Sequence, residues 1–170
     1  MTPVSTNLKR MAGVAVAAFL MALPAWGQTL TIALSSNAVN FPLTKGSASN
    51  PGSTSISATT TCAGCFFQTV NVYAYFNNSA AALTNAGNNI PSSAFQISNN
   101  GGGFQALTNT EPFGGAGAGI QLSNFFVFFG FFGDSHTDTM NFNIDLSSGA
   151  LATLPPGTYS GTLTIRAQAP

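Results

Sequence analysis

The stretch FFQTVNVYAYF, from Phe66 to Phe76, is the clearest strand pattern in this chain. Residues two apart lie on the same face of an extended strand, whereas one face of a helix repeats every three to four residues. The stretch alternates with a period of two. One side carries Phe66, Val70, Val72, Ala74 and Phe76, and the other carries Asn71, Tyr73 and Tyr75. It therefore predicts a central β-strand with one face turned towards a core.

The same alternation recurs in both directions along the chain. It predicts strands at 30–34, 39–41, 53–61, 95–98, 104–108, 138–146 and 158–167. The predicted inward residues of the last two are Met140, Phe142, Ile144, Leu146, Tyr159, Leu163, Ile165 and Ala167. No window of ten or more residues has helical spacing, and clusters of Gly, Asn, Ser and Pro separate the strands. We therefore predict an all-β chain folded as an immunoglobulin-like two-sheet β-sandwich, with long loops over 77–89, 101–103 and 114–119.

Charged residues make up only 5% of the 170 residues, against roughly 25% in an ordinary soluble protein. A chain with no basic patch lacks what nucleic acids recognise, so that class of function is excluded. Disorder is excluded too, because 45% of the residues are apolar. Uncharged Ser, Thr and Asn surfaces can pack side by side without the cost of burying charge, which favours a structural protein.

The N-terminal segment predicts export. Lys9 and Arg10 precede thirteen almost wholly apolar residues, 11–23, and small residues follow up to Gly27. This order is typical of a secretory signal peptide. A membrane anchor is the alternative, but thirteen helical residues rise only about 20 Å, less than the ~30 Å hydrocarbon core. We predict a signal peptide at 1–27 and one β-sandwich domain at 28–170, secreted to the periplasm, the cell surface or the exterior.

The predicted mature chain keeps two cations, Lys45 and Arg166, against four carboxylates, Glu111, Asp134, Asp138 and Asp145, for a net charge of −2. Its two cysteines form the sequence Cys62-Ala63-Gly64-Cys65 between two predicted strands. An oxidising compartment favours a structural disulfide, which here would staple a hairpin loop. A redox motif is the alternative, but it needs a following helix, and a zinc site would lack ligands.

The only cluster of side chains that could carry catalytic or metal chemistry consists of Asp134, His136 and Asp138. They share one face if the segment is extended, and we interpret them as a solvated turn between two apolar strands, with a metal or acid–base site as the alternative. Ser135 points to the opposite face from His136, so no Ser–His pair forms. We expect no enzyme, no metal and no cofactor.

The run from Phe125 to Phe132 places large rings on both faces of any strand that it forms. Either loops of the same domain cover its second face, or that face is an assembly surface. With no Pro and no charge, the run also has the composition of an aggregation-prone segment. Phe125, Phe126, Phe128 and Phe129 are the candidate interaction residues.

The C-terminal sequence LPPGTYSGTLTI, 154–165, resembles the closing strand of spore coat protein U-type domains, the subunits of archaic chaperone–usher pili. The start is similar as well: a signal, the alternating strand at Leu30–Leu34, Val39-Asn40-Phe41 and a Ser/Thr-rich strand that ends in Cys62. Two features depart from the family: no early cysteine stands near Ser35, and the chain ends in Gln-Ala-Pro instead of an aromatic residue.

This resemblance implies an incomplete immunoglobulin-like fold that is completed first by a periplasmic chaperone and then, at an outer-membrane usher, by the N-terminal strand of the next subunit. Leu30, Ile32 and Leu34 are the candidate assembly residues, although the same strand could pair within its own domain. We therefore expect a secreted, non-enzymatic structural or adhesive pilus subunit that self-associates. The alternative is a monomeric carbohydrate- or surface-binding module that uses Tyr73, Tyr75 and Asn-rich turns.

Overall fold

The computed structural model describes residues 27–130 and 133–170. This part of the chain contains ten strands and two short 3₁₀ helices, joined by irregular segments. The predicted signal peptide lies outside these residues except for Gly27. The elements in chain order are β1 (Thr29–Leu34), β2 (Ile56–Ala63), β3 (Cys65–Tyr75), β4 (Leu83–Asn85), β5 (Asn88–Ile90), η1 (Ser92–Ala94), β6 (Phe95–Asn99), β7 (Gln105–Ala106), β8 (Gly119–Gly130), β9 (Asp134–Ile144), η2 (Gly149–Thr153) and β10 (Thr164–Gln168).

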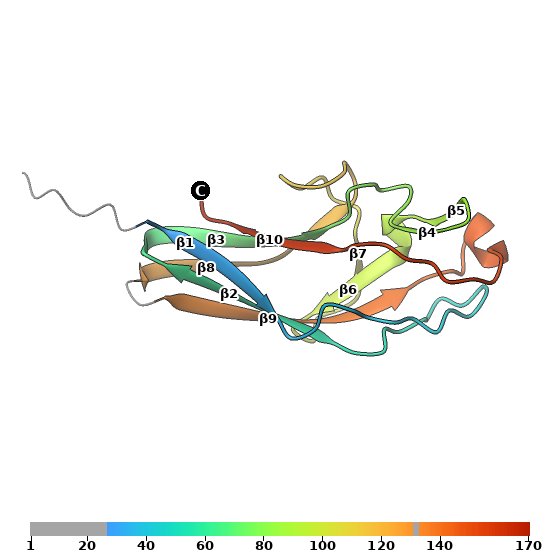
Figure 1. The fold of residues 1–170 in the computed structure, drawn as a ribbon, viewed down its shortest axis with the longest axis horizontal. Helices are drawn as coiled ribbons and strands as arrows, with labels where there is room; N and C mark the ends of the chain where they lie inside the picture. The colour runs from blue at the N-terminus through green and yellow to red at the C-terminus, as the bar shows by residue number, and fades with distance from the viewer. Residues whose placement is uncertain (1–26, 131–132) are drawn as a thin grey trace, which may run out of the picture.

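The strands form two antiparallel layers, as the alternation predicts (Figure 1). The first sheet has the order β1-β2-β9-β6-β7, and the second has the order β10-β3-β8. A separate hairpin joins β4 to β5. The all-β sandwich is therefore confirmed, and β3, which contains Phe66 to Tyr75, is the central strand of the second sheet.

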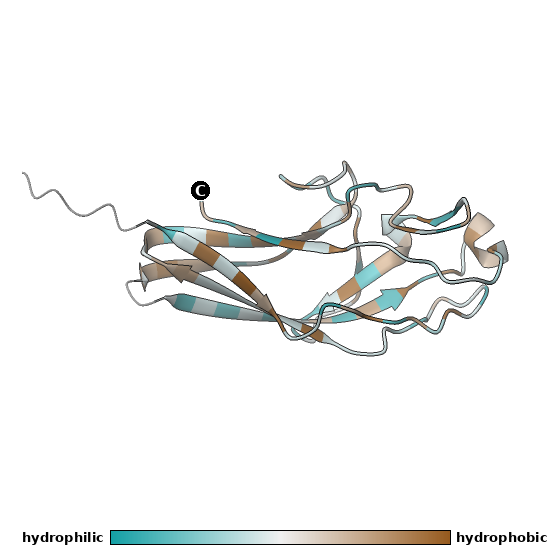
Figure 2. Ribbon diagram, viewed as in Figure 1, coloured by the Kyte–Doolittle hydropathy of each residue, from teal (hydrophilic) through white to brown (hydrophobic). Residues whose placement is uncertain are grey.

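Two unequal apolar cores fill the space between the sheets. The larger one packs Phe76, Phe95 and Phe142 together, with ring centroids 5.1 Å apart for the first pair and 5.9 Å for the second. The smaller one contains Cys62, Cys65, Val70 and Val127. Figure 2 shows the alternating hydropathy along the strands that produces this layering.

A polar belt separates the two cores. On β2, the fully buried Thr60 lies between Ala58 of the larger core and Cys62 of the smaller one. On β9, the fully buried Asp138 precedes Met140 of the larger core. The sandwich is therefore not apolar along its whole length.

The prediction of a strand at 39–41 is wrong, because residues 35–50 are irregular in the structure. The strand predicted at 158–167 is also shorter than expected, since β10 begins only at Thr164. Both segments carry alternating residues, but each lacks a neighbouring strand to complete a backbone ladder. The predicted loop at 77–89 instead contains the β4–β5 hairpin, whose turn uses Ala86 and Gly87 at positive φ.

Candidate functional site

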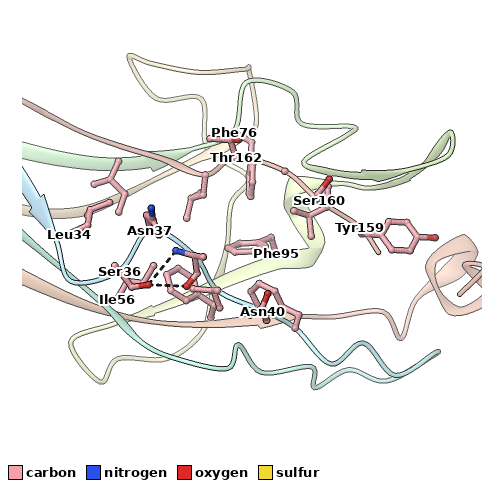
Figure 3. A pocket seen from close by; sticks show the side chains of 18 of the residues that line it. Leu34, Ser36, Asn37, Asn40, Ile56, Phe76, Phe95, Tyr159, Ser160 and Thr162 are labelled. Atoms are coloured by element: carbon pink, nitrogen blue, oxygen red, sulfur yellow. Dashed lines mark hydrogen bonds between the residues drawn. The ribbon is translucent and has the colours of Figure 1, made fainter. Parts of the chain in front are cut away.

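An open groove runs between the two irregular segments that were predicted to be strands. One wall comes from residues 34–41 after β1, and the other from residues 158–165 at the start of β10. The groove has a volume of about 380 Å³, and apolar residues of the larger core, among them Phe76, Phe95 and Phe142, form its floor. Figure 3 shows labelled side chains of the two walls, with Phe95 between them. The residue pattern places Phe76 and Phe142 on inward faces but does not predict the groove, because its floor is formed by residues from three separate segments that meet only in the folded chain.

Backbone groups of each wall form hydrogen bonds with a neighbouring segment of the chain and not with the opposite wall. In the first wall, the Ser35 N–H donates to the Ser57 carbonyl and the Asn40 N–H to the Ser53 hydroxyl. In the second wall, Ser160 exchanges two backbone hydrogen bonds with Thr84 of the β4–β5 hairpin. Within the described residues, no hydrogen bond crosses from one wall to the other, so the groove is a gap between two strand-like edges.

The candidate assembly strand β1 pairs antiparallel with β2 of its own chain, from Thr29↔Ala63 to Leu34↔Ala58. Leu30 packs against the smaller core and Ile32 against the larger one, and both are only half-buried. Leu34 is 46% exposed and lines the groove. A single chain thus uses β1 internally, but as an edge strand that buries little of its surface.

The two cysteines form the predicted disulfide at the β2–β3 turn. Their Cα atoms are 5.9 Å apart, and both side chains are fully buried in the smaller core. Gly64 between them has a φ of 74°, a left-handed conformation that glycine adopts without steric cost. The Gln28 side chain lies close by and donates to the Cys65 sulfur and the Gln68 side-chain oxygen. The hairpin end is therefore held both covalently and by the first residue of the predicted mature chain.

The interpretation of Asp134, His136 and Asp138 as a solvated turn is wrong, because all three residues belong to β9. Their side chains share one face, but only Asp134 is exposed, whereas Asp138 is fully buried. The imidazole of His136 stacks on the Phe125 ring, with centroids 4.9 Å apart, and its Nε2 lies 3.4 Å from Asp138 Oδ1. The turn was mispredicted because β2 pairs with the whole segment from Asp134 to Met140.

The Asp138 carboxylate is occupied by structural hydrogen bonds. Its Oδ1 accepts from the side-chain amides of Asn99 at 2.7 Å and Asn100 at 3.3 Å, and its Oδ2 accepts from the Ser123 hydroxyl at 2.7 Å. No group of three or more His, Cys, Asp or Glu side chains that could hold a metal occurs in the described residues. These contacts tie the two sheets together across the polar belt.

The tyrosines of the alternative binding module, Tyr73 and Tyr75, are buried instead of facing outwards. Each is only 8% exposed, because Phe113 from the 109–118 loop covers them, with ring centroids 5.8 Å from Tyr73 and 6.2 Å from Tyr75. The Arg166 guanidinium lies 4.0 Å from the centroid of the Phe113 ring. Burial, and secondarily the charge of Glu111, raises the pKa of Tyr73. The two rings therefore offer no open face on which a sugar could stack.

The phenylalanine run forms the second half of β8, and its rings differ in burial. Phe125 is half-buried and Val127 fully buried, whereas Phe126, Phe128 and Phe129 are 55%, 55% and 60% exposed. Within residues 27–130 and 133–170, loops of the same domain therefore leave these three rings more than half exposed. Phe67 of β3, 59% exposed, joins them, which the sequence pattern missed because its φ of 50° takes it out of the strand alternation.

Comparisons with known proteins assign no family: no family model, curated protein or solved structure matches the chain. Among residues 27–130 and 133–170, no helix has the length and hydropathy needed to cross a membrane.

Proposed function

We propose that the chain is a secreted, non-enzymatic structural or adhesive subunit of pilus type, whose copies join by β-strand addition. The observation that carries this proposal is the open groove between residues 34–41 and 158–165. An added strand would find backbone edges on both sides and an apolar floor beneath it, which is what β-augmentation requires.

The donor strand that we propose is the segment 28–34 of another copy. Its alternating Leu30, Ile32 and Leu34 would face the groove floor, and burying each contributes about 1.5–3 kcal/mol before the cost of ordering the strand. Both ends of the predicted mature chain resemble spore coat protein U-type domains, and this resemblance supports assembly by strand addition. On this proposal, a periplasmic chaperone fills the groove before an outer-membrane usher delivers the next subunit.

A peptide experiment tests the groove without altering the protein. Fluorescent peptides spanning residues 28–36 are titrated into the mature chain, and binding is followed by fluorescence anisotropy. We expect the native peptide to bind, and a peptide with Ile32→Asp to bind at least tenfold more weakly, because a carboxylate would have to enter the apolar floor. A peptide with Thr31→Asp is the matched control, since Thr31 faces away from the core in β1.

Equal affinity of the two altered peptides, or no binding of the native one, would contradict strand addition. The complementary experiment places Ile32→Asp in the chain itself. Such a chain should still accept the native peptide but no longer donate its own strand, so larger species disappear from size-exclusion chromatography while peptide binding persists.

A further inference from the structure

The strand β8 has an open edge on the side away from β3. In the second sheet, β8 is the last strand. Near its start, this outer edge is occupied by a bridge between Gly119 and Asn109 and by the Asn99 side chain, which donates to the Leu122 carbonyl. From Ser123 to Phe129, no described strand pairs with this edge.

This edge lacks the features that usually prevent edge-to-edge pairing. Natural edge strands carry charges or prolines or are covered by other segments. Residues 119–130 contain no Asp, Glu, Lys, Arg or Pro. The segment therefore presents an uncharged backbone edge between large apolar side chains.

Four exposed phenylalanine rings form what we call the aromatic patch: Phe126, Phe128 and Phe129 of β8 and Phe67 of the neighbouring strand β3. The ring of Phe128 lies 4.7 Å from that of Phe67 and 4.5 Å from that of Phe129, so the rings contact one another. At 55–60% exposure each, they present on the order of 450 Å² of apolar surface. A stable dimer buries about 800 Å² on each partner, so the patch would supply roughly half and the strand edge with its flanks the rest.

We propose that the aromatic patch and the free edge of β8 bind a second copy of this chain, with the two β8 strands antiparallel across a two-fold axis. Such an interface is closed, since each copy contributes the same edge once. Centring the axis on Val127 places Phe126 of one copy opposite Phe128 of the other, which pairs aromatic side chains across the new ladder. A lipid surface fits less well, because a hydrocarbon phase leaves the backbone groups of an open strand edge without partners.

This contact goes beyond the proposed function and uses the opposite edge of the second sheet. Strand addition would take place beside β10, whereas the new contact lies at β8. Copies joined end to end through the groove could therefore also join side by side through the patch. Experiment can separate the two contacts, because Ile32→Asp should abolish strand addition at the groove and leave the contact between β8 strands intact.

Sedimentation velocity of the mature chain over roughly 1–100 µM tests the contact. The native chain should show a concentration-dependent dimer, and Phe126→Ser together with Phe128→Ser should weaken dimerisation at least tenfold. Phe104→Ser is the matched control, because Phe104 is 50% exposed but lies in a glycine-rich loop away from the patch. The far-ultraviolet circular dichroism of all variants should be unchanged, since each ring is exposed.

A second pair of variants tests the register. Phe126→Lys with Phe128→Glu places opposite charges across the two-fold axis, whereas Phe126→Lys with Phe128→Lys places like charges there. Both remove the same rings, so the first should dimerise at least tenfold more tightly than the second. Equal behaviour of these two variants would overturn the proposed pairing.

Two outcomes of the sedimentation experiment, and one of a vesicle flotation assay on the same chains, would also overturn the proposal. The first is a native chain that remains monomeric at every concentration in the range. The second is open-ended aggregation that the two serine substitutions do not change. The third is a native monomer that floats with phosphatidylcholine vesicles only when Phe126 and Phe128 are present, which would assign the patch to lipid.

Discussion

The carboxylate of Asp138 is fully buried, and three side chains donate to its two oxygens. Buried polar groups are stable only when they are paired, so this residue fixes the distance between β9, the Asn99–Asn100 turn and β8. The polar belt is thus a specific connection between the sheets and not a gap in the core.

Asp138→Ala should lower the free energy of unfolding by about 2–4 kcal/mol, because it removes the acceptor of the Ser123 hydroxyl, of the Asn100 amide and of one of the two hydrogen bonds that the Asn99 amide donates. Urea denaturation followed by circular dichroism measures this change. Asp134→Ala on the same strand is the control, since its side chain is exposed, and it should change stability by less than about 0.5 kcal/mol. A small effect of Asp138→Ala would show that the belt contributes little.

At the end of β9, the carboxylate of Asp145 accepts hydrogen bonds from the Ser147 hydroxyl at 2.6 Å and the Ser147 backbone N–H at 2.9 Å. These bonds, the hydroxyl first, hold the pKa of Asp145 below its ordinary value. A pKa lowered by folding gives stability that is present above the unfolded value, near pH 4, and is lost as the pH falls through the folded pKa.

Ser147→Ala should therefore raise the pKa of Asp145 towards its ordinary value, because it removes the larger of the two causes. A carbon-detected NMR titration of the Asp145 carboxyl group measures the shift. The backbone N–H remains in this variant, so some lowering should persist. An unchanged pKa would mean that the backbone bond alone is responsible.

Among the elements, the β2–β3 hairpin owes its closed end to the disulfide. Cys62 and Cys65 contribute half of the buried residues of the smaller core, so the bond also fills space. The bond encloses a very short loop, for which the chain-entropy estimate is about 2 kcal/mol. The edge strand β1 packs Leu30 against the same end of the sandwich.

Cys62→Ala together with Cys65→Ala should lower the free energy of unfolding by about 2–4 kcal/mol, since the lost loop constraint adds to the lost packing of two buried sulfurs. Urea melts of the native chain with and without reductant provide the comparison. Reduction alone should account for about 2 kcal/mol. If neither treatment changes the melt, the hairpin end is held by its other contacts.

For the whole molecule, the unequal cores predict unequal local stability. The larger core surrounds the inner residues of β9, such as Met140 and Ile144, whereas β1 lies at a sheet edge with half-exposed side chains. Segments with little buried apolar surface open at low free energy. Strand exchange between copies also requires that β1 detach easily from β2 of its own chain.

Amide hydrogens of β1 should therefore exchange with deuterium at least tenfold faster than those of Met140–Ile144 in the native chain. Hydrogen-exchange mass spectrometry on peptides that cover the two segments makes the comparison. Strong protection of β1, equal to that of β9, would argue against its release from β2 and hence against its role as a donor.

The residue pattern alone specifies the period-two strands, the all-β class, the inward side of Met140–Leu146 and the adjacency of the two cysteines. These are local properties, because the pleat of a strand sets which residues share a face and a two-residue spacer brings neighbouring cysteines into reach.

Only the tertiary structure decided which strands have neighbours and what covers each face. Residues 39–41 and 158–163 alternate like strands yet form no ladder, because in the described part of the chain they make only isolated hydrogen bonds, such as those between Ser160 and Thr84. Phe113 buries Tyr73 and Tyr75 from a loop far away in sequence, whereas Phe126 and Phe128 stay more than half exposed among the described residues. Burial depends on distant segments meeting in space, and the repeat of a single strand carries no information about them.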